Sequence, residues 1–315
     1  MKKIIRIQQD DDSLLHLTWI INNICTNSCS YCPSDLHNGK NHNYDWEKAR
    51  EFFKMLFERY PKIHCSVSGG EPSISPFFRE IVETFHNAGH TIGVTSNAAK
   101  PVRYWAEIAP FLSYICFSYH PENPDPNFAQ KISVVCMNTL TTVRIMMHPE
   151  YWDHCVEVHD SLKDNEFIFV EPVRITNWWG MKNTHLSEYT DAQLEWFYNN
   201  SRNNKQLTHI LPSKPVARIN SKIYFDDGTV DEQPNTIEYV NSGMTNFFGY
   251  TCEIGLKELK VDWLGKVMLG NCDNNVIGYI GEPDNIKWPT SSVVCDKTSC
   301  VCTTSVNINK WIEND

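Results

Sequence analysis

The sequence predicts an α/β fold with a mainly parallel sheet that is closed or partly closed into a barrel. Strand-like and helix-like segments alternate from about residue 15 to residue 175, and this alternation implies right-handed crossovers between parallel strands. Polar clusters recur where the predicted strands end. From about residue 205 the pattern changes to short strand-like pieces with turns, so we expect the barrel to end there and a smaller domain to follow.

Each predicted helix or strand has a local signature. Residues 45–60 place apolar side chains at helical spacing after Asp45, which is a suitable N-cap. Gly89 is expected to end a second helix, and Asp227-Gly228 is a hairpin signal. The expected strands are 4–8, 15–23, 63–68, 91–97, 114–120, 141–148 and 167–175, and the expected helices are 45–60, 75–89, 101–111 and 151–164.

The composition is that of an ordinary globular protein. Of the 315 residues, 41% are hydrophobic and 21% are charged, and no apolar run approaches the ~18 residues that a membrane span needs. Residues 1–13 lack the apolar stretch and cleavage site of a signal peptide. The net charge of −10, without clustered Lys and Arg, argues against nucleic-acid binding. We therefore expect a cytoplasmic protein with a small-molecule substrate.

The 12 cysteines fall into two clusters and a scattered remainder. Secreted disulfide frameworks are typical of much shorter chains, so the clustered thiols are better interpreted as metal ligands. The scattered cysteines lie in apolar or mixed segments and are expected to behave as small hydrophobic residues. These are Cys65, Cys116, Cys136 and Cys155.

The first cluster has the spacing Cys25-x3-Cys29-x2-Cys32 and follows a predicted strand directly. Three thiolates on one short loop can hold an iron-sulfur cluster while one iron keeps no protein ligand. Zinc usually takes four ligands, and only His37 and His42 lie close by in the sequence. The spacing therefore favours an iron-sulfur cluster over zinc.

The segment Cys-Thr-Asn-Ser-Cys-Ser-Tyr-Cys resembles the signature of radical S-adenosylmethionine (radical SAM) enzymes, with Tyr31 at their usual aromatic position. The order of the later motifs is similar too. The resemblance implies that the GGEP segment binds the amino group of the methionine moiety and that two later strand ends hold the rest of the cofactor. The residues concerned are Gly69, Gly70, Glu71, Pro72, Ser96, Asn97, Ser118 and His120.

This resemblance implies a fold, two cofactors and a reaction. The fold would be a partial (β/α)6 TIM-like barrel. A [4Fe-4S] cluster would bind S-adenosylmethionine (SAM) through its open iron, and one electron would cleave SAM to a 5′-deoxyadenosyl radical that abstracts hydrogen from substrate. The electron would come from a reducing partner such as flavodoxin or ferredoxin.

The second cluster occupies the last 64 residues. A hairpin turned at residues 262–265 can bring Cys252 and Cys272 together. The last three cysteines then supply one thiol more than the two that would complete a four-cysteine cluster. The arrangement resembles twitch or SPASM auxiliary-cluster domains and implies a second [4Fe-4S] cluster, whereas a structural zinc site remains an alternative. We expect a barrel at 1–225 and this domain at 226–315, with the boundary between 205 and 245. The cysteines are Cys252, Cys272, Cys295, Cys300 and Cys302, of which one of the last three would be spare.

Arg144, Glu171 and Arg174 lie at or just beyond late strand ends, near the expected cavity mouth, as does the pair Trp178-Trp179. They are candidates for substrate contact. The alternative is that the charges form structural pairs and the tryptophans pack in the core.

Three functions remain open at this point. The first is a radical SAM enzyme that oxidises or rearranges a small polar metabolite, with the tail cluster accepting an electron or anchoring substrate. The second is radical maturation of a ribosomally made peptide, for which a leader peptide would need a binding surface other than the short segment before the barrel. The third is a non-catalytic electron carrier or scaffold, which would not need a GGEP segment.

Overall fold

The structure is a computed structural model that describes residues 2–37, 39, 45–175, 189–200, 220–272 and 275–313. The chain divides into two compact units. The first unit consists of Met1–Ile20, His42–Cys65 and Ala217–Asp315, and the second of Ile21–Asn41 and Ser66–Val216. Each unit is described separately below.

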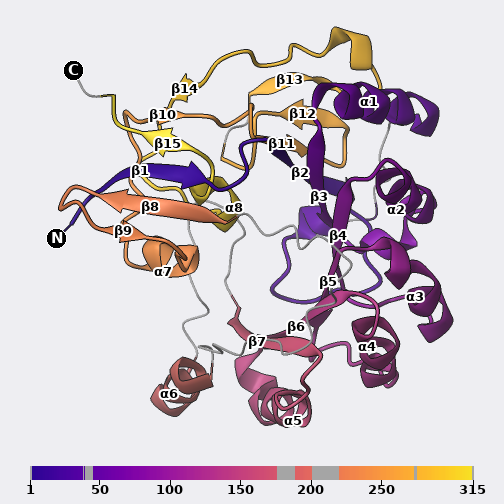
Figure 1. Ribbon diagram of the computed structural model, residues 1–315. Coiled ribbons are helices and arrows are strands. Elements are labelled where there is room, and N and C mark those ends of the chain that lie inside the picture. Colours follow the sequence, from indigo (N-terminus) through magenta and orange to yellow (C-terminus); the bar gives the residue numbers. More distant parts are fainter. Residues whose placement is uncertain are drawn as a thin grey trace. The chain divides into compact units, whose positions relative to one another are not determined.

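The second unit is built from alternating strands and helices (Figure 1). Its strands β4, β5, β6 and β7 pair in parallel with their sequence neighbours. Figure 1 shows helices α2 to α5 along one side of these strands. The bounds are β4 Thr91–Ser96, β5 Tyr114–Tyr119, β6 Leu140–Met147 and β7 Ile168–Arg174, with α2 Phe78–Asn87, α3 Val102–Ile108, α4 Phe128–Cys136, α5 Trp152–Leu162 and α6 Asp191–Asn200.

The larger sheet is open. Its strand order is β13-β12-β11-β2-β3-β4-β5-β6-β7, where β2 is Leu14–Asn22 and β3 is Lys62–Gly69. Strands β2 to β7 are adjacent in chain order, and a helix follows each of β2 to β6, beginning with α1 (Trp46–Arg59). The prediction of an α/β fold with a partial barrel is therefore confirmed.

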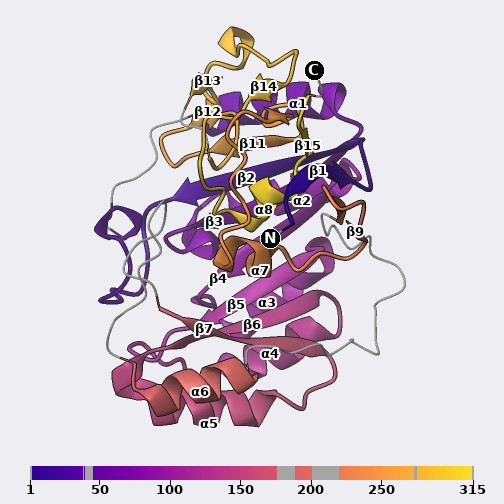
Figure 2. The same cartoon turned by 90° about the vertical axis from the view of Figure 1, so that its left-hand side faces the viewer.

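The core of the second unit lies between these strands and helices. Trp105 of α3 meets Phe117 of β5 edge-on, with ring centroids 5.0 Å apart. Trp152 of α5 packs against Trp196 of α6 in the same way, and Figure 2 shows these two helices side by side. The four scattered cysteines are all buried, as expected for small hydrophobic residues.

The first unit contains a six-stranded sheet of order β14-β10-β15-β1-β8-β9, whose reported pairs are all antiparallel. In addition, β11 pairs in parallel with β2 and continues into β12 and β13 by antiparallel pairing. The bounds are β1 Ile4–Gln9, β8 Ser221–Phe225, β9 Val230–Asp231, α7 Thr236–Asn241, β10 Thr251–Cys252, β11 Glu258–Val261, β12 Lys266–Met268, β13 Val276–Tyr279, β14 Val293–Val294, α8 Thr303–Val306 and β15 Lys310–Trp311.

Several local signals have the predicted effect. The Asp45 side chain accepts a hydrogen bond from the Glu47 N–H and caps α1. Gly228, with φ +82°, turns the chain between β8 and β9, and Gly265, with φ +77°, does so between β11 and β12. The predicted domain boundary between residues 205 and 245 stays a prediction. None of the described helices is long and apolar enough to cross a membrane.

Two histidines are buried together in the first unit. His16 on β2 and His64 on β3 have ring centroids 5.9 Å apart. Burial lowers the pKa of His16 to about 3, with a further contribution from His64, and burial lowers the pKa of His64 to about 4. Both rings are therefore neutral in the folded protein at neutral pH.

We predict that this pair makes folding sensitive to mild acid. Below pH 6.5 these histidines are protonated in the unfolded chain but stay neutral in the folded protein. The free energy of unfolding therefore falls from about pH 6.5 toward pH 4, and at pH 5.5 the loss is about 1.4 kcal/mol per histidine. Urea denaturation at pH 7.5 and 5.5 measures this. His16→Gln and His64→Gln should reduce the pH dependence, whereas His86→Gln on the exposed side of α2 should not. Equal slopes in all variants would contradict the prediction.

Candidate active site

The cysteine loop begins three residues after β2, in the second unit. Cys29 is buried, and Cys25 and Cys32 are partly buried. Amide groups donate to two of the thiols: the Asn27 N–H lies 3.4 Å from the Cys25 Sγ, and the Asn123 Nδ2 lies 3.6 Å from the Cys29 Sγ. Burial raises the pKa of the Cys25 and Cys29 thiols, so a positive metal centre and these donors would be needed to keep them as thiolates.

In the part of the chain that the structure describes, no group of three or more His, Cys, Asp or Glu side chains is close enough to hold a metal ion. The donor set nevertheless suits an iron-sulfur cluster, because three thiols on one loop have amide donors beside them.

Two glycines let the GGEP segment lie directly against the cysteine loop. The Gly70 N–H donates to the Asn22 carbonyl at 3.0 Å, and the Glu71 N–H donates to the Ile24 carbonyl at 2.7 Å. A Cβ on Gly69, whose φ is +145°, would lie 2.4 Å from the Asn22 oxygen, and a Cβ on Gly70 would lie 2.2 Å from the Ile24 oxygen. Only glycine permits this approach of two backbones.

Glu71 joins the GGEP segment to the end of β4. Its carboxylate is fully buried, and it accepts hydrogen bonds from the Ser73 N–H at 2.9 Å, the Ser96 hydroxyl at 2.7 Å and the Asn97 N–H at 2.7 Å. Burial raises the pKa of Glu71, whereas these hydrogen bonds act in the opposite direction. Since protein groups surround the carboxylate, Glu71 positions the segment, and Pro72 starts the 3-10 helix Pro72–Ile74 behind it.

Asn97 extends from this junction to the cysteine loop. Its Nδ2 lies 3.1 Å from the Thr26 Oγ1 and 3.5 Å from the Cys25 Sγ. Its Oδ1 is buried and has no hydrogen-bond partner among the described residues. A buried carbonyl oxygen without a partner is costly, so this atom is suited to accept a hydrogen bond from a bound cofactor.

A second polar group borders the loop at the end of β5. The His120 Nδ1 lies 2.8 Å from the Tyr31 hydroxyl and 3.5 Å from the Cys29 Sγ, and the two rings are stacked with an interplanar angle of 15°. Burial lowers the pKa of His120 to about 4, so the imidazole is neutral at pH 7. Tyr31 and His120 were both predicted as cofactor-binding residues, and the structure brings them together.

Two residues of this region were missed by sequence reasoning. Glu122 accepts hydrogen bonds from the Ser30 N–H at 2.8 Å and the Ser30 hydroxyl at 2.5 Å, and it lies 3.5 Å from the His148 Nε2. Asn123 donates to Cys29, as described above. Both lie within three residues after His120, the end of a predicted strand. This position beside a strand end is the sequence feature that could have identified them as site residues.

Three of the predicted residues share one row across the parallel strands. Ser118 on β5 is opposite Arg144 on β6, and Arg144 is opposite Glu171 on β7. The Arg144 Nε lies 2.9 Å from the Glu171 Oε2, and the side chains remain 43% and 49% exposed. A salt bridge this exposed contributes little to stability, which leaves its charges available for binding.

Arg174 lies apart from this row. It is three residues after Glu171 on the same strand, so its side chain points to the opposite face. There the guanidinium lies over the rings of Phe197 and Tyr198, 5.4 and 5.7 Å from their centroids. The pair Trp178-Trp179 falls outside the described residues.

The tail cysteines lie in the first unit. Cys252 and Cys300 are buried, and Cys272 and Cys295 pack against the small core around Cys252. Burial raises the pKa of Cys272, with further contributions from Cys300, Glu258 and Cys252, and burial raises the pKa of Cys300 to about 12. These electrostatic interactions place the thiols near one another, and Cys302 belongs to the same group because it interacts with Cys300.

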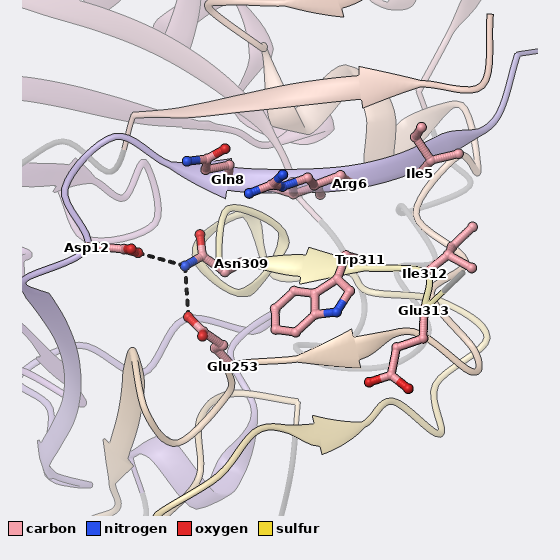
Figure 3. Close-up of a pocket in the computed structure, with 10 residues that line it drawn as sticks. Ile5, Arg6, Gln8, Asp12, Glu253, Asn309, Trp311, Ile312 and Glu313 are labelled. Carbon is pink, nitrogen blue, oxygen red and sulfur yellow. Dashed lines mark hydrogen bonds between the residues drawn. The ribbon is translucent and has the colours of Figure 1, made fainter. Parts of the chain in front are cut away.

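The first unit also has a cavity of about 790 Å³ beside β1 and β15 (Figure 3). Figure 3 shows Arg6, Gln8 and Trp311 along it, with Asn309 between two carboxylates. The Asn309 Nδ2 donates to Asp12 at 2.8 Å and to Glu253 at 2.7 Å. None of the predicted site residues lines this cavity.

Comparisons with known proteins agree with this site. Residues 19–172 match the family model described as the radical SAM superfamily. This segment spans the cysteine loop, the GGEP segment and the row of Ser118, Arg144 and Glu171. No curated protein sequence matches the chain.

Solved structures of anSMEcpe share the fold. The structure of anSMEcpe with bound AdoMet is 14% identical and covers 85% of this chain and 78% of its own, with a TM-score of 0.53. The structure of the same protein with AdoMet and the Kp18Cys peptide has the same identity, coverage and TM-score. Streptococcus suis SuiB bound to S-adenosylmethionine is 11% identical over 81% of this chain and 60% of its own, with a TM-score of 0.49.

The cysteine loop, the GGEP segment and the parallel strands thus define a radical SAM domain. Residues 19–172 thus belong to the radical SAM superfamily, and the protein is an enzyme that carries this domain. Its cofactors are a [4Fe-4S] cluster and SAM. The unpartnered Asn97 Oδ1 and the backbone at Gly69 and Gly70 are suited to contact such a cofactor.

We predict that Gly70→Ala disrupts the cysteine loop. The added Cβ would lie 2.2 Å from the Ile24 oxygen and 2.6 Å from the Leu36 oxygen, so the two backbones must separate, at a cost of about 1–3 kcal/mol. Iron and sulfide per chain after anaerobic reconstitution should fall.

The matched control is Gly228→Ala, which has a strained φ of +82° but open space around the new Cβ. It should cost about 1 kcal/mol in stability and leave iron binding unchanged. Normal iron binding in Gly70→Ala would show that the close approach is not needed.

Proposed function

We propose that this protein is a radical SAM enzyme that abstracts a hydrogen atom from a residue of a peptide substrate. When the cluster is bound and reduced, it supplies the electron that cleaves SAM to methionine and a 5′-deoxyadenosyl radical. The observation that carries the proposal is the attachment of Asn97 to both Glu71 and Cys25, because it links the predicted cofactor motifs in one site.

The residues of the chain have distinct tasks in this proposal. Cys25, Cys29 and Cys32 hold the cluster. The backbone of Gly69 and Gly70 and the free Oδ1 of Asn97 bind SAM, and Glu71 keeps these groups in place. Tyr31, Ser118 and His120 line the same edge of the sheet, where the neutral His120 ring lies beside the Tyr31 hydroxyl and the Cys29 thiol.

The substrate is proposed to be a peptide that Arg144 and Glu171 orient. Their exposed ion pair offers both a cation and an anion, which suits the charged side chains or termini of a peptide. A structure of this fold also holds a peptide together with AdoMet, although the identity of 14% carries the likeness only at the level of the fold. The small polar metabolite predicted from the sequence is the alternative outcome of the test.

The test is anaerobic reconstitution followed by reaction with SAM and a reductant, either dithionite or reduced flavodoxin. Formation of 5′-deoxyadenosine is the expected result, and its absence would leave the electron-carrier function ahead. Pools of peptides and of small metabolites are then compared for stimulation of 5′-deoxyadenosine formation and for products with altered mass. Stimulation by metabolites alone would overturn the peptide proposal.

We predict that Arg144→Met and Glu171→Gln each reduce substrate-dependent turnover at least about tenfold, because each removes a charged hydrogen bond of the kind that contributes about 1.5–3 kcal/mol. Iron content and the response of the cluster to SAM should stay at wild-type levels. The matched control is Arg103→Ala, whose side chain is 91% exposed on α3. Turnover unchanged in both site variants would show that the pair is structural.

We also propose that the tail holds a second [4Fe-4S] cluster on four of its five cysteines, which accepts an electron from the substrate radical or anchors substrate. The protein should then bind about eight iron atoms per chain, and Cys272→Ala should lower this to about four. Cys65→Ala, at a buried thiol on β3, is the control and should keep all the iron. About four iron atoms together with one zinc in the wild type would instead make the tail a structural zinc site.

A further inference from the structure

Lys131 is a buried lysine on α4, in the same unit as the cofactor site. Only 5% of it is exposed, although lysine is almost never buried unless it is paired. Its Nζ donates to the Asp125 carboxylate and, at 2.7 Å, to the Ala98 carbonyl oxygen. The ammonium group is therefore held by the Asp125 carboxylate on one side and by the backbone carbonyl of Ala98 on the other.

Ala98 has an unusual backbone conformation. Its φ is +63°, and it is the only non-glycine with a positive φ among the described residues. Residues with a Cβ rarely adopt this left-handed conformation, so the surroundings must hold it in place. The Ala98 N–H donates to the Ser96 hydroxyl at 2.9 Å, and Lys131 binds the Ala98 carbonyl on the other side.

This turn fixes the direction of Asn97, the residue before it. The Asn97 N–H donates to Glu71, and its Nδ2 contacts Thr26 and Cys25. The φ angle of Ala98 sets the peptide plane between residues 97 and 98 relative to the Ala98 carbonyl that Lys131 holds. A carbonyl and a φ that are both held in place therefore keep that plane, and with it Asn97, in one orientation.

We propose that Lys131 is a positioning residue for the cofactor site, which acts by holding Ala98 in its left-handed turn and so aims Asn97 at the cluster and SAM. Lys131 itself touches none of the predicted cofactor ligands in its reported hydrogen bonds. The inference concerns SAM binding alone and does not depend on which substrate the enzyme uses.

A double-mutant cycle on the reconstituted full-length enzyme tests this mechanism. Lys131→Met should keep the iron and weaken SAM binding about tenfold, as loss of one charged hydrogen bond implies. Ala98→Gly should bind SAM within about twofold of wild type, because glycine adopts a positive φ without help. In the double variant the glycine should restore most of the affinity that Lys131→Met loses.

The affinity is measured by titrating SAM into the reduced enzyme and following the change in the electron paramagnetic resonance spectrum of the cluster, with thermal unfolding recorded in parallel. Asp125→Asn is the matched control, because it removes the ion pair but leaves the Lys131 bond to Ala98. This variant should lower the temperature of thermal unfolding, whereas its loss of SAM affinity should be smaller than that of Lys131→Met. An equal loss of affinity in Asp125→Asn, or no rescue by Ala98→Gly, would overturn the proposal.

A shorter substitution, Lys131→Gln, serves if the methionine variant does not fold, because glutamine cannot reach the Ala98 carbonyl but stays polar. The same weakening of SAM binding and the same rescue by glycine are expected. If neither variant folds, with or without Gly at position 98, Lys131 supports the fold as a whole, and the positioning role is wrong.

Discussion

The cofactor site depends on the buried carboxylate of Glu71. A carboxylate removed from water is stable only when several donors replace its hydration, and here three donors come from two segments of the chain, residues 73 and 96–97. The requirement fixes the distance between the GGEP segment and the end of β4. Because Asn97 also contacts Cys25, the same constraint reaches the cysteine loop.

The loop itself is held unevenly. Its start is fixed by backbone hydrogen bonds from Gly70 and Glu71 to the residues just before Cys25. Its later part is held by side chains, since Cys29 meets His120 and Asn123. Backbone pairing is the more rigid of the two, and long side chains can rotate. The start of the loop beside Cys25 is therefore held more tightly than its later part.

Much of this arrangement was predictable because its signals are local. The cysteine spacing, the GGEP segment and the Asp45 cap each lie within a few residues. The pairing of β1 with β8 and β15 joins residues more than 200 positions apart, which periodicity cannot reveal. Burial of Lys131 was equally hidden, because its partner Ala98 lies 33 residues earlier, in the loop after β4. From the sequence, Arg174 was grouped with Arg144 and Glu171, although the two-residue period of a strand places Arg174 on the opposite face from Glu171.

In the tail, as at Glu71, a buried carboxylate binds the backbone close to a cysteine. Glu258 is fully buried and accepts hydrogen bonds from the N–H and side chain of Asn271, which precedes Cys272. Lys310 is buried too, and it donates to carbonyls of α8 and Ile308, just after Cys302. The lysine offsets the negative charge that the carboxylate and the thiolates would place in one apolar region. Burial raises the pKa of Glu258, Cys252 and Cys300, and the Lys310 ammonium acts against it by lowering the pKa of each of these groups.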